Sequence, residues 1–131
     1  NMPALTPKGR IAKGKALEDY VASQIVEKGL DPRAHRSFGS GNTNTEKSDI
    51  WTSLQILGQN VGIECKHADT ISIPEWWRQA KKLSSLGYEP LLVFKQTADK
   101  YSDTKTVMYL DTLLELLKKL KEVENLLAKR N

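Results

Sequence analysis

The pattern of hydrophobic and polar positions along this chain predicts three helices. Between residues 10 and 28, apolar residues recur at helical spacing, and Gly29 ends the stretch. A second helix is expected over about 72–85, where a serine and a proline mark the start. The third should span 112–129 and should be capped at its N-terminus by Asp111.

Short apolar runs between these helices predict strands. They lie at about 34–38, 49–56, 61–67, 90–94 and 106–110. Residues 58–60 should form the turn of a hairpin between the second and third strands. The element order α-β-β-β-α-β-β-α therefore predicts an α/β fold with a mixed β-sheet flanked by helices.

Two acidic residues and one lysine lie on the two strands of this hairpin. Asp49 opens one strand, and Glu64 and Lys66 end the apolar run of the other. Residues two apart on a strand share a face, so Glu64 and Lys66 should project together, and the right register would bring Asp49 beside them. Two carboxylates can hold a hard divalent cation, and a lysine can stabilise negative charge on a phosphodiester. A simple surface ion pair between Glu64 and Lys66 is the alternative.

Composition limits the classes of protein that remain. The chain has 131 residues, 27% charged and 39% hydrophobic, which indicates one globular domain at 10–131 behind a flexible basic N-terminal arm at 1–9. A net charge of +4 suits a nucleic-acid binder, although ordinary solvated lysines explain it equally well. Cys65 is the only cysteine, which favours a reducing, intracellular (cytoplasmic) setting, and no apolar run is long enough to cross a membrane.

Asp49 and Glu64-Cys65-Lys66, followed by a helix and the apolar strand 91–94, make this chain resemble the PD-(D/E)XK nuclease superfamily, whose fold is restriction-endonuclease-like. Over roughly residues 10–97 it is similar to the archaeal-type Holliday junction resolvases. That fuller resemblance adds the opening segment 13–18 and Arg36-Ser37 before a glycine- and serine-containing loop. One departure is Ser48, which stands where the superfamily name has proline.

The resemblance implies a role for each matching residue. Glu18, Asp49, Glu64 and Lys66 would be catalytic, and Asp49, Glu64 and the carbonyl of Cys65 would bind Mg²⁺ or Mn²⁺. Contacts to DNA would come from a set of basic and polar residues: Lys13, Lys15, Arg36, Ser37, Ser40, Lys47 and Gln79. Either Ser37 or Ser40 would be the loop serine near the scissile phosphate, and Gln79 could equally be an exposed helix residue.

The expected function is therefore that of a homodimeric Holliday junction resolvase acting on four-way or branched DNA. Another PD-(D/E)XK endonuclease, of the flap, nicking or restriction-like kind, is an alternative, as is a non-catalytic DNA-binding module of the same fold. Leucines at three- and four-residue spacing in the last helix predict either a dimer seam or a helix docked on its own sheet. Of the adjacent Trp76 and Trp77, one should lie in the core, and the other could stack on DNA or enter the seam, although core packing of both is the safer expectation.

Overall fold

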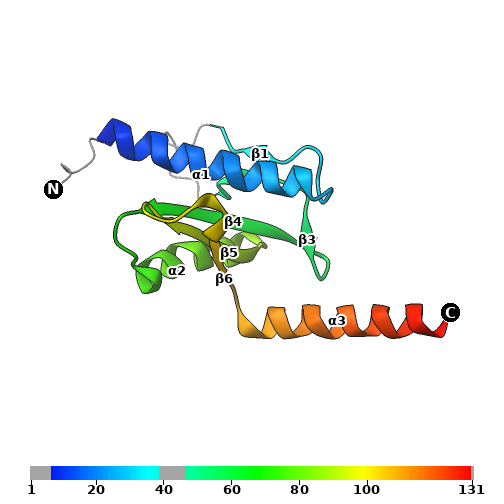
Figure 1. Cartoon of the computed structure of the whole chain (residues 1–131). Coiled ribbons are helices and arrows are strands. Elements are labelled where there is room, and N and C mark those ends of the chain that lie inside the picture. The colour runs from blue at the N-terminus through cyan, green and yellow to red at the C-terminus, as the bar shows by residue number, and fades with distance from the viewer. Residues whose placement is uncertain (1–6, 39–46, 131) are drawn as a thin grey trace.

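A four-stranded mixed sheet forms the centre of the molecule (Figure 1). The computed structural model describes residues 7–38 and 47–130. The strands lie in the order β3 (Gln55–Ile56), β4 (Gln59–Ala68), β5 (Glu89–Gln96) and β6 (Lys105–Val107), and only the β4–β5 pair is parallel. A separate antiparallel ribbon pairs β1 (His35–Arg36) with β2 (Ile50–Trp51). The predicted α/β fold, restriction-endonuclease-like with helices flanking a mixed sheet, is confirmed.

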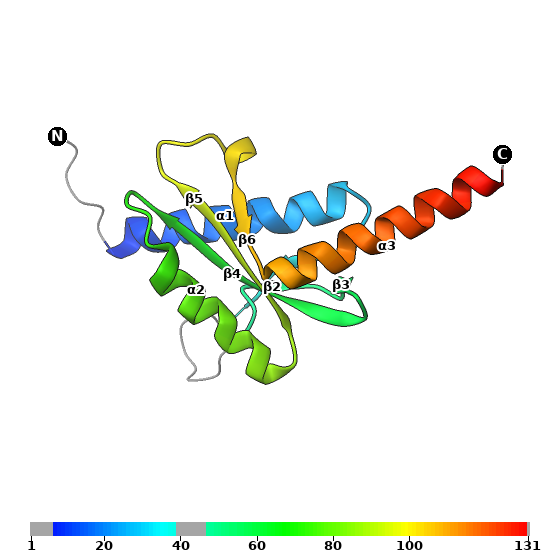
Figure 2. The same ribbon diagram turned by 90° about the horizontal axis from the view of Figure 1, so that it is seen from below.

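Two helices cover opposite faces of this sheet (Figures 1 and 2). Helix α1 (Pro7–Glu27) packs on the face that carries Ile63 and Val93. Helix α2 (Ile73–Lys81), capped at Ser72 and continued by the 3₁₀ turn η1 (Lys82–Leu86), packs on the face that carries Leu92 and Phe94. Successive residues of β5 thus enter different cores, which explains why the whole run is apolar.

The N-terminal boundary of α1 differs from the prediction. The helix begins at Pro7 instead of residue 10, so residues 7–9 of the expected arm are helical. Proline is well tolerated in a first helical turn, where its missing N–H has no helical partner to lose. The rest of that arm, residues 1–6, lies outside the described residues.

The strand expected at 49–56 is split in two. β2 ends at Trp51 and β3 begins at Gln55, because the chain between them is bound to Asp31. Thr52 Oγ1 and the Ser53 N–H donate to Asp31 Oδ2, at 2.6 and 2.9 Å. The hairpin turn consists of Leu57-Gly58, both with positive φ, rather than of residues 58–60. A two-residue turn of this kind matches the twist of the flanking strands.

The last helix, α3 (Leu110–Lys129), extends away from the sheet as an arm (Figure 2). Its N-cap is Tyr109, so the prediction of an Asp111 cap is wrong; Asp111 lies in the first turn. The strand expected at 106–110 is also shorter and ends at Val107. Thr112 is the one buried residue of the helix, so the structure contradicts the alternative in which α3 docks on its own sheet.

Both adjacent tryptophans pack inside the protein. Trp76 is buried against Phe94, and Trp77 is half-buried and contacts Tyr109 edge to face at 5.1 Å between ring centroids. The expectation that one of them lies in the core is confirmed, and the other packs beside it. Within residues 7–38 and 47–130, no helix is at once long and apolar enough to span a membrane.

Candidate active site

Asp49 lies directly against β4, where it is bonded to the two residues that flank Glu64. Its backbone N–H donates to the Ile63 carbonyl at 2.7 Å, and its carboxylate Oδ2 accepts the Cys65 N–H at 2.8 Å. These two bonds hold Asp49 beside Glu64, which lies between Ile63 and Cys65. The convergence of Asp49 and Glu64 that the hairpin pattern predicted is therefore present, although Asp49 precedes a two-residue strand.

Ser48 explains how this contact is maintained without the proline of the superfamily name. The side chain of Ser48 is buried, and its Oγ donates to the Ile50 carbonyl at 2.7 Å and accepts the Ile63 N–H at 2.9 Å. A proline has no side-chain oxygen to make these bonds. The serine therefore joins the segment that carries Asp49 to the strand that carries Glu64.

Glu64 and Lys66 project together, as their spacing predicts. Lys66 Nζ lies 3.3 Å from Glu64 Oε1, and both side chains are largely shielded from solvent. The ion pair leaves the lysine ammonium beside a carboxylate of the site. The ion pair that the alternative names is thus present, and its two side chains are partly buried.

Glu18 approaches the same acids from α1. It is buried, and desolvation raises the pKa of its carboxyl, while Arg36 opposes that shift and Asp19 and Glu64 add to it. The pKa of Asp49 is raised to about 7, mainly by desolvation and then by the charges of Glu64 and Glu18. The Cys65 N–H and Lys66 act in the opposite direction and lower it. Three carboxyl groups that disfavour one another's ionisation in this way form an electrostatic environment suited to a cation.

The donor chemistry of the site fits a hard divalent cation. Asp49 and Glu64 supply carboxylate oxygens, and Mg²⁺ commonly takes one or two carboxylates together with waters and phosphate oxygens. Within residues 7–38 and 47–130, no three His, Cys, Asp or Glu side chains gather closely enough to form a complete metal cage. Burial raises the pKa of the Cys65 thiol well above its usual value, so the sulfur stays protonated and the predicted ligand is the backbone carbonyl.

Two of the predicted DNA-binding residues lie next to Glu64. A hollow of about 250 Å³ is lined by Lys47, Glu64, Gln79, Lys82 and Leu83. Gln79 is half-buried and shares this hollow with Glu64, and Lys47 lines it as well. Lys82, three residues after Gln79, lines the same hollow; the sequence marks it only as one of several basic residues.

Other predicted DNA contacts are engaged within the fold. Lys13 forms an ion pair with Asp69 at 3.1 Å and a hydrogen bond to Thr97, and its side chain is mostly buried. Arg36 Nε lies 3.4 Å from Asp19, and Ser37 Oγ donates to the Ser48 carbonyl at 2.8 Å. Lys15 is exposed on α1. Ser40 lies outside the described residues, and the DNA-binding roles of all these residues remain predictions.

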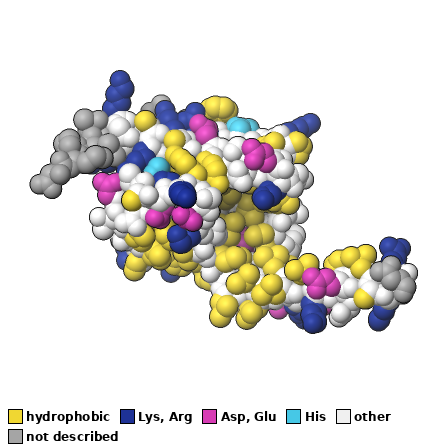
Figure 3. Space-filling view, viewed as in Figure 1, with side chains coloured by type: hydrophobic (Ala, Val, Ile, Leu, Met, Phe, Trp, Pro, Cys, Tyr) yellow, Lys and Arg dark blue, Asp and Glu magenta, His cyan; other side chains and the backbone are white. Residues whose placement is uncertain are grey.

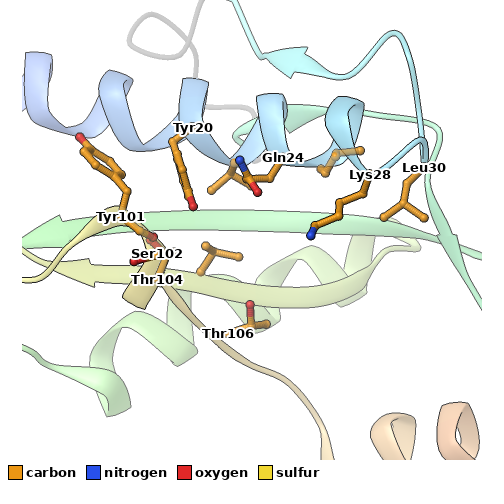
Figure 4. Close-up of a pocket in the computed structure, with 11 residues that line it drawn as sticks. Tyr20, Gln24, Lys28, Leu30, Tyr101, Ser102, Thr104 and Thr106 are labelled. Atoms are coloured by element: carbon orange, nitrogen blue, oxygen red, sulfur yellow. The ribbon is translucent and has the colours of Figure 1, made fainter.

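A larger hollow lies apart from these acids (Figure 4). It measures about 310 Å³ between α1 and the β5–β6 edge, and its labelled lining includes Tyr20, Gln24, Lys28 and Tyr101. No carboxylate lines it, so it lacks the groups that a metal-dependent nuclease requires. The size of a hollow alone therefore does not identify the reaction centre.

A mixed sheet between two helices, with Asp49, Glu64 and Lys66 brought together on it, defines the PD-(D/E)XK class of nucleases. Residues 9–129 match the model of a family described as phage putative PDDEXK endonuclease, and the chain belongs to that family. No curated protein and no solved structure matches the chain. The match supports nuclease activity on DNA and, as is general for this class, dependence on a divalent metal. It does not extend to the archaeal-type resolvases.

Proposed function

We propose that this protein is a Mg²⁺- or Mn²⁺-dependent endonuclease that resolves branched DNA, and four-way junctions in particular. The observation that carries the nuclease proposal is the position of Asp49 across β4, bonded to both neighbours of Glu64. Asp49, Glu64 and the Cys65 carbonyl would hold the metal, which supplies Lewis-acid activation of the phosphoryl group and of the attacking water. Lys66 would stabilise negative charge that develops on the phosphate.

Glu18 and the polar residues around the site complete the proposed machinery. Glu18 would adjust the charge of the acidic group from α1, since it acts electrostatically on Asp49. Lys47 and Gln79 would contact the DNA backbone beside Glu64, because both line the same hollow. Lys13, Lys15, Arg36, Ser37 and Ser40 would extend this contact along the DNA.

The proposed preference for four-way junctions draws on the sequence resemblance and on the shape of the molecule. A junction presents two equivalent strands, and a two-fold symmetric homodimer supplies two matching sites. The exposed leucines of α3 offer a surface for such a dimer. An enzyme of this kind would act in DNA recombination or repair, in the cytoplasm and in association with the nucleoid.

A second candidate is another PD-(D/E)XK endonuclease of the flap, nicking or restriction-like kind. The family match favours it equally, because its description names an endonuclease without a substrate. A non-catalytic DNA-binding module is less favoured, since Asp49, Glu64 and Lys66 are all present and carboxylates facing phosphates would weaken binding.

One assay separates these possibilities. The full chain is incubated with four-way junction, flap and linear duplex DNA in Mg²⁺, in Mn²⁺, in Ca²⁺ and in EDTA. We expect paired cuts in the junction with Mg²⁺ or Mn²⁺, and none in Ca²⁺ or EDTA. Preferential cutting of flap or duplex would replace the resolvase proposal by the second candidate.

Variants of the acidic pair test the site itself. Asp49→Asn and Glu64→Gln should each reduce cleavage by at least 10²- to 10³-fold, the range seen for loss of a key electrostatic group, while binding of junction DNA persists. Glu122→Gln, on the exposed α3, is the matched control and should keep full activity. A fully active Glu64→Gln protein would overturn the site assignment.

A further inference from the structure

A stack of three aromatic rings lies on the β1–β2 ribbon. His35 pairs with Trp51 across the ribbon, and their rings stack at 5.1 Å with an angle of 18° between planes. Phe38 stacks on His35 at 5.3 Å and 29°. Trp51 is 49% exposed and Phe38 is 73% exposed. Large aromatic side chains that are exposed to solvent and yet stacked on one another are typical of a binding surface.

Trp51 also lines a hollow. This hollow measures about 340 Å³, within the range of about 300–1,000 Å³ usual for small-ligand sites. Lys47, Ser37, Asn60 and Tyr88 are among its other lining residues. It therefore combines an aromatic ring, one cation and several hydrogen-bonding groups, which is the combination that a nucleotide requires.

Lys47 connects this hollow to the acidic site. It lines the hollow beside Trp51, and it also lines the one that contains Glu64 and Gln79. Trp51 itself is two residues from Asp49, on the strand that Asp49 precedes. A nucleotide held against Trp51 would thus be joined by its own backbone to the phosphates nearest Glu64.

We propose that the hollow beside Trp51 receives a single unstacked nucleotide of the DNA substrate. Its base stacks on the indole of Trp51, and its phosphate contacts Lys47. His35 and Phe38 hold the indole in place from the ribbon side. This inference rests on the proposed DNA nuclease function and adds a source of selectivity, since DNA with an unpaired or easily unstacked nucleotide fills the hollow at lower cost than a perfect duplex.

Intact duplex offers no free base face, because each base is stacked on its neighbours. Stacking of a base on an aromatic side chain usually changes affinity on the order of tenfold. Selectivity from Trp51 should therefore appear as a difference between two DNAs and not as a uniform loss of binding. A phosphate contact alone, by contrast, would weaken binding to both DNAs equally.

The test uses two short duplexes of one sequence, one perfect and one carrying a single bulged 2-aminopurine. Equilibrium binding and 2-aminopurine fluorescence are measured with the full chain in Ca²⁺, where cutting should not occur. We expect tighter binding of the bulged duplex, on the order of tenfold, with the fluorescence quenched by the indole. Trp51→Ala should abolish the preference and the quenching, and Trp51→Phe should keep most of the preference.

Glu122→Gln is the control, since Glu122 is exposed on α3, outside the β1–β2 ribbon. It should leave the preference unchanged, and circular dichroism should show all variants folded. A Trp51→Ala protein that still prefers the bulge, or that only changes its oligomeric state, would overturn the nucleotide site.

The nuclease proposal fails separately from this one. If the wild-type chain prefers the bulged duplex through Trp51 but cuts no DNA in Mg²⁺ or Mn²⁺, the nucleotide site is supported and the catalytic proposal is overturned. If it cuts DNA in Mg²⁺ and shows no preference that depends on Trp51, the catalytic proposal stands and the nucleotide site is overturned.

Discussion

At the scale of single residues, the acidic site is maintained at an energetic cost. Asp49 is held against β4 by the Cys65 N–H, beside the carboxylate of Glu64 and within electrostatic reach of Glu18. Burial and these like charges oppose its ionisation, which is why its pKa is raised. Lys66 offsets only part of this charge, because it is already paired with Glu64. A bound divalent cation would offset much more.

The first prediction concerns metal and stability. Mn²⁺ or Mg²⁺ should raise the melting temperature of the wild-type protein by several degrees, since a ligand at one hundred times its Kd adds about 2.7 kcal/mol to the free energy of unfolding. Asp49→Asn should lose most of this increase, and Glu122→Gln should retain it. Differential scanning fluorimetry with and without metal measures the effect. An equal rise in all three proteins would mean that the metal binds elsewhere.

Asp31 supports the fold away from the acids. Its carboxylate accepts hydrogen bonds from Thr52 Oγ1 and from the backbone N–H groups of Arg33 and Ser53. Of these, the Thr52 bond contributes most to lowering the pKa of Asp31 from 3.8 to about 2. A lowered carboxyl pKa adds stability above the unfolded value of 3.8, and this contribution is lost as the pH falls towards 2.

The second prediction follows from that sign. Asp31→Asn should lower the melting temperature by several degrees near neutral pH, and the difference from wild type should shrink steadily as the pH falls below 4. Thermal unfolding followed by circular dichroism over that pH range checks the trend. Glu75→Gln, on the exposed start of α2, serves as the control. A difference between Asp31→Asn and wild type that stays constant with pH would show that the carboxylate charge is not responsible.

At the scale of elements, strand periodicity predicted which site residues share a face but did not predict where the strands begin and end. The i, i+2 rule put Glu64 and Lys66 on one face, and the structure agrees. The split between β2 and β3 could not be predicted, because it depends on Asp31, which lies about twenty residues earlier in the sequence. The bond that Ser48 Oγ accepts from the Ile63 N–H of β4 is hidden for the same reason. Local pattern cannot report a contact between distant segments.

A glycine at the centre of β4 shows how closely the elements pack. A Cβ atom on Gly62 would lie 2.7 Å from Tyr88 Cβ and 3.1 Å from Leu83 Cβ. Both neighbours belong to the segment between α2 and β5, which packs on the same face as Glu64. The absence of a side chain at residue 62 therefore allows η1 and the start of β5 to approach the strand that carries the site.

The third prediction tests this approach. Gly62→Ala should lower the free energy of unfolding by about 1–3 kcal/mol, the usual cost of overpacking. Gly14→Ala is the matched control, because nothing lies within 4 Å of a Cβ at that helical position. It should leave stability unchanged or raise it by about 0.4–1 kcal/mol. Urea titrations of the three proteins measure both effects; equal stability of Gly62→Ala and wild type would refute the close contact.

At the scale of the whole molecule, α3 is the element without a partner. Leucines and a valine lie along it, and most are half exposed or more. Figure 3 shows hydrophobic side chains along this arm. The sequence pattern predicted the stripe but could not decide between a docked helix and a dimer seam, because both bury the same face. The short β6 takes the chain away from the sheet, so the stripe is left for another molecule.

Charges beside the stripe suit a parallel pair of α3 helices. The apolar positions Leu113, Leu116, Leu120, Val123 and Leu127 alternate spacings of three and four and therefore follow a heptad repeat. In that repeat Lys119 occupies a g position and Glu124 the following e position. In a parallel coiled coil, g of one helix lies beside the next e of the other, so Lys119 would face Glu124 of the partner subunit twice in each dimer.

The fourth prediction is that the protein dimerises through α3. Sedimentation should give a dimer for wild type and a monomer for the double variant Leu116→Asp with Leu120→Asp, while Lys118→Asp, outside the stripe, should remain dimeric. Lys119→Glu and Glu124→Lys should each weaken the dimer, and together they should restore it, since the pair is then exchanged rather than lost. Failure of the double exchange to restore it would exclude the parallel arrangement.

Heterodimers carrying one Asp49→Asn subunit should nick a four-way junction and leave the opposing strand intact. Wild-type monomers at concentrations where junctions are cut on both strands would contradict the dimer, and with it the resolvase proposal.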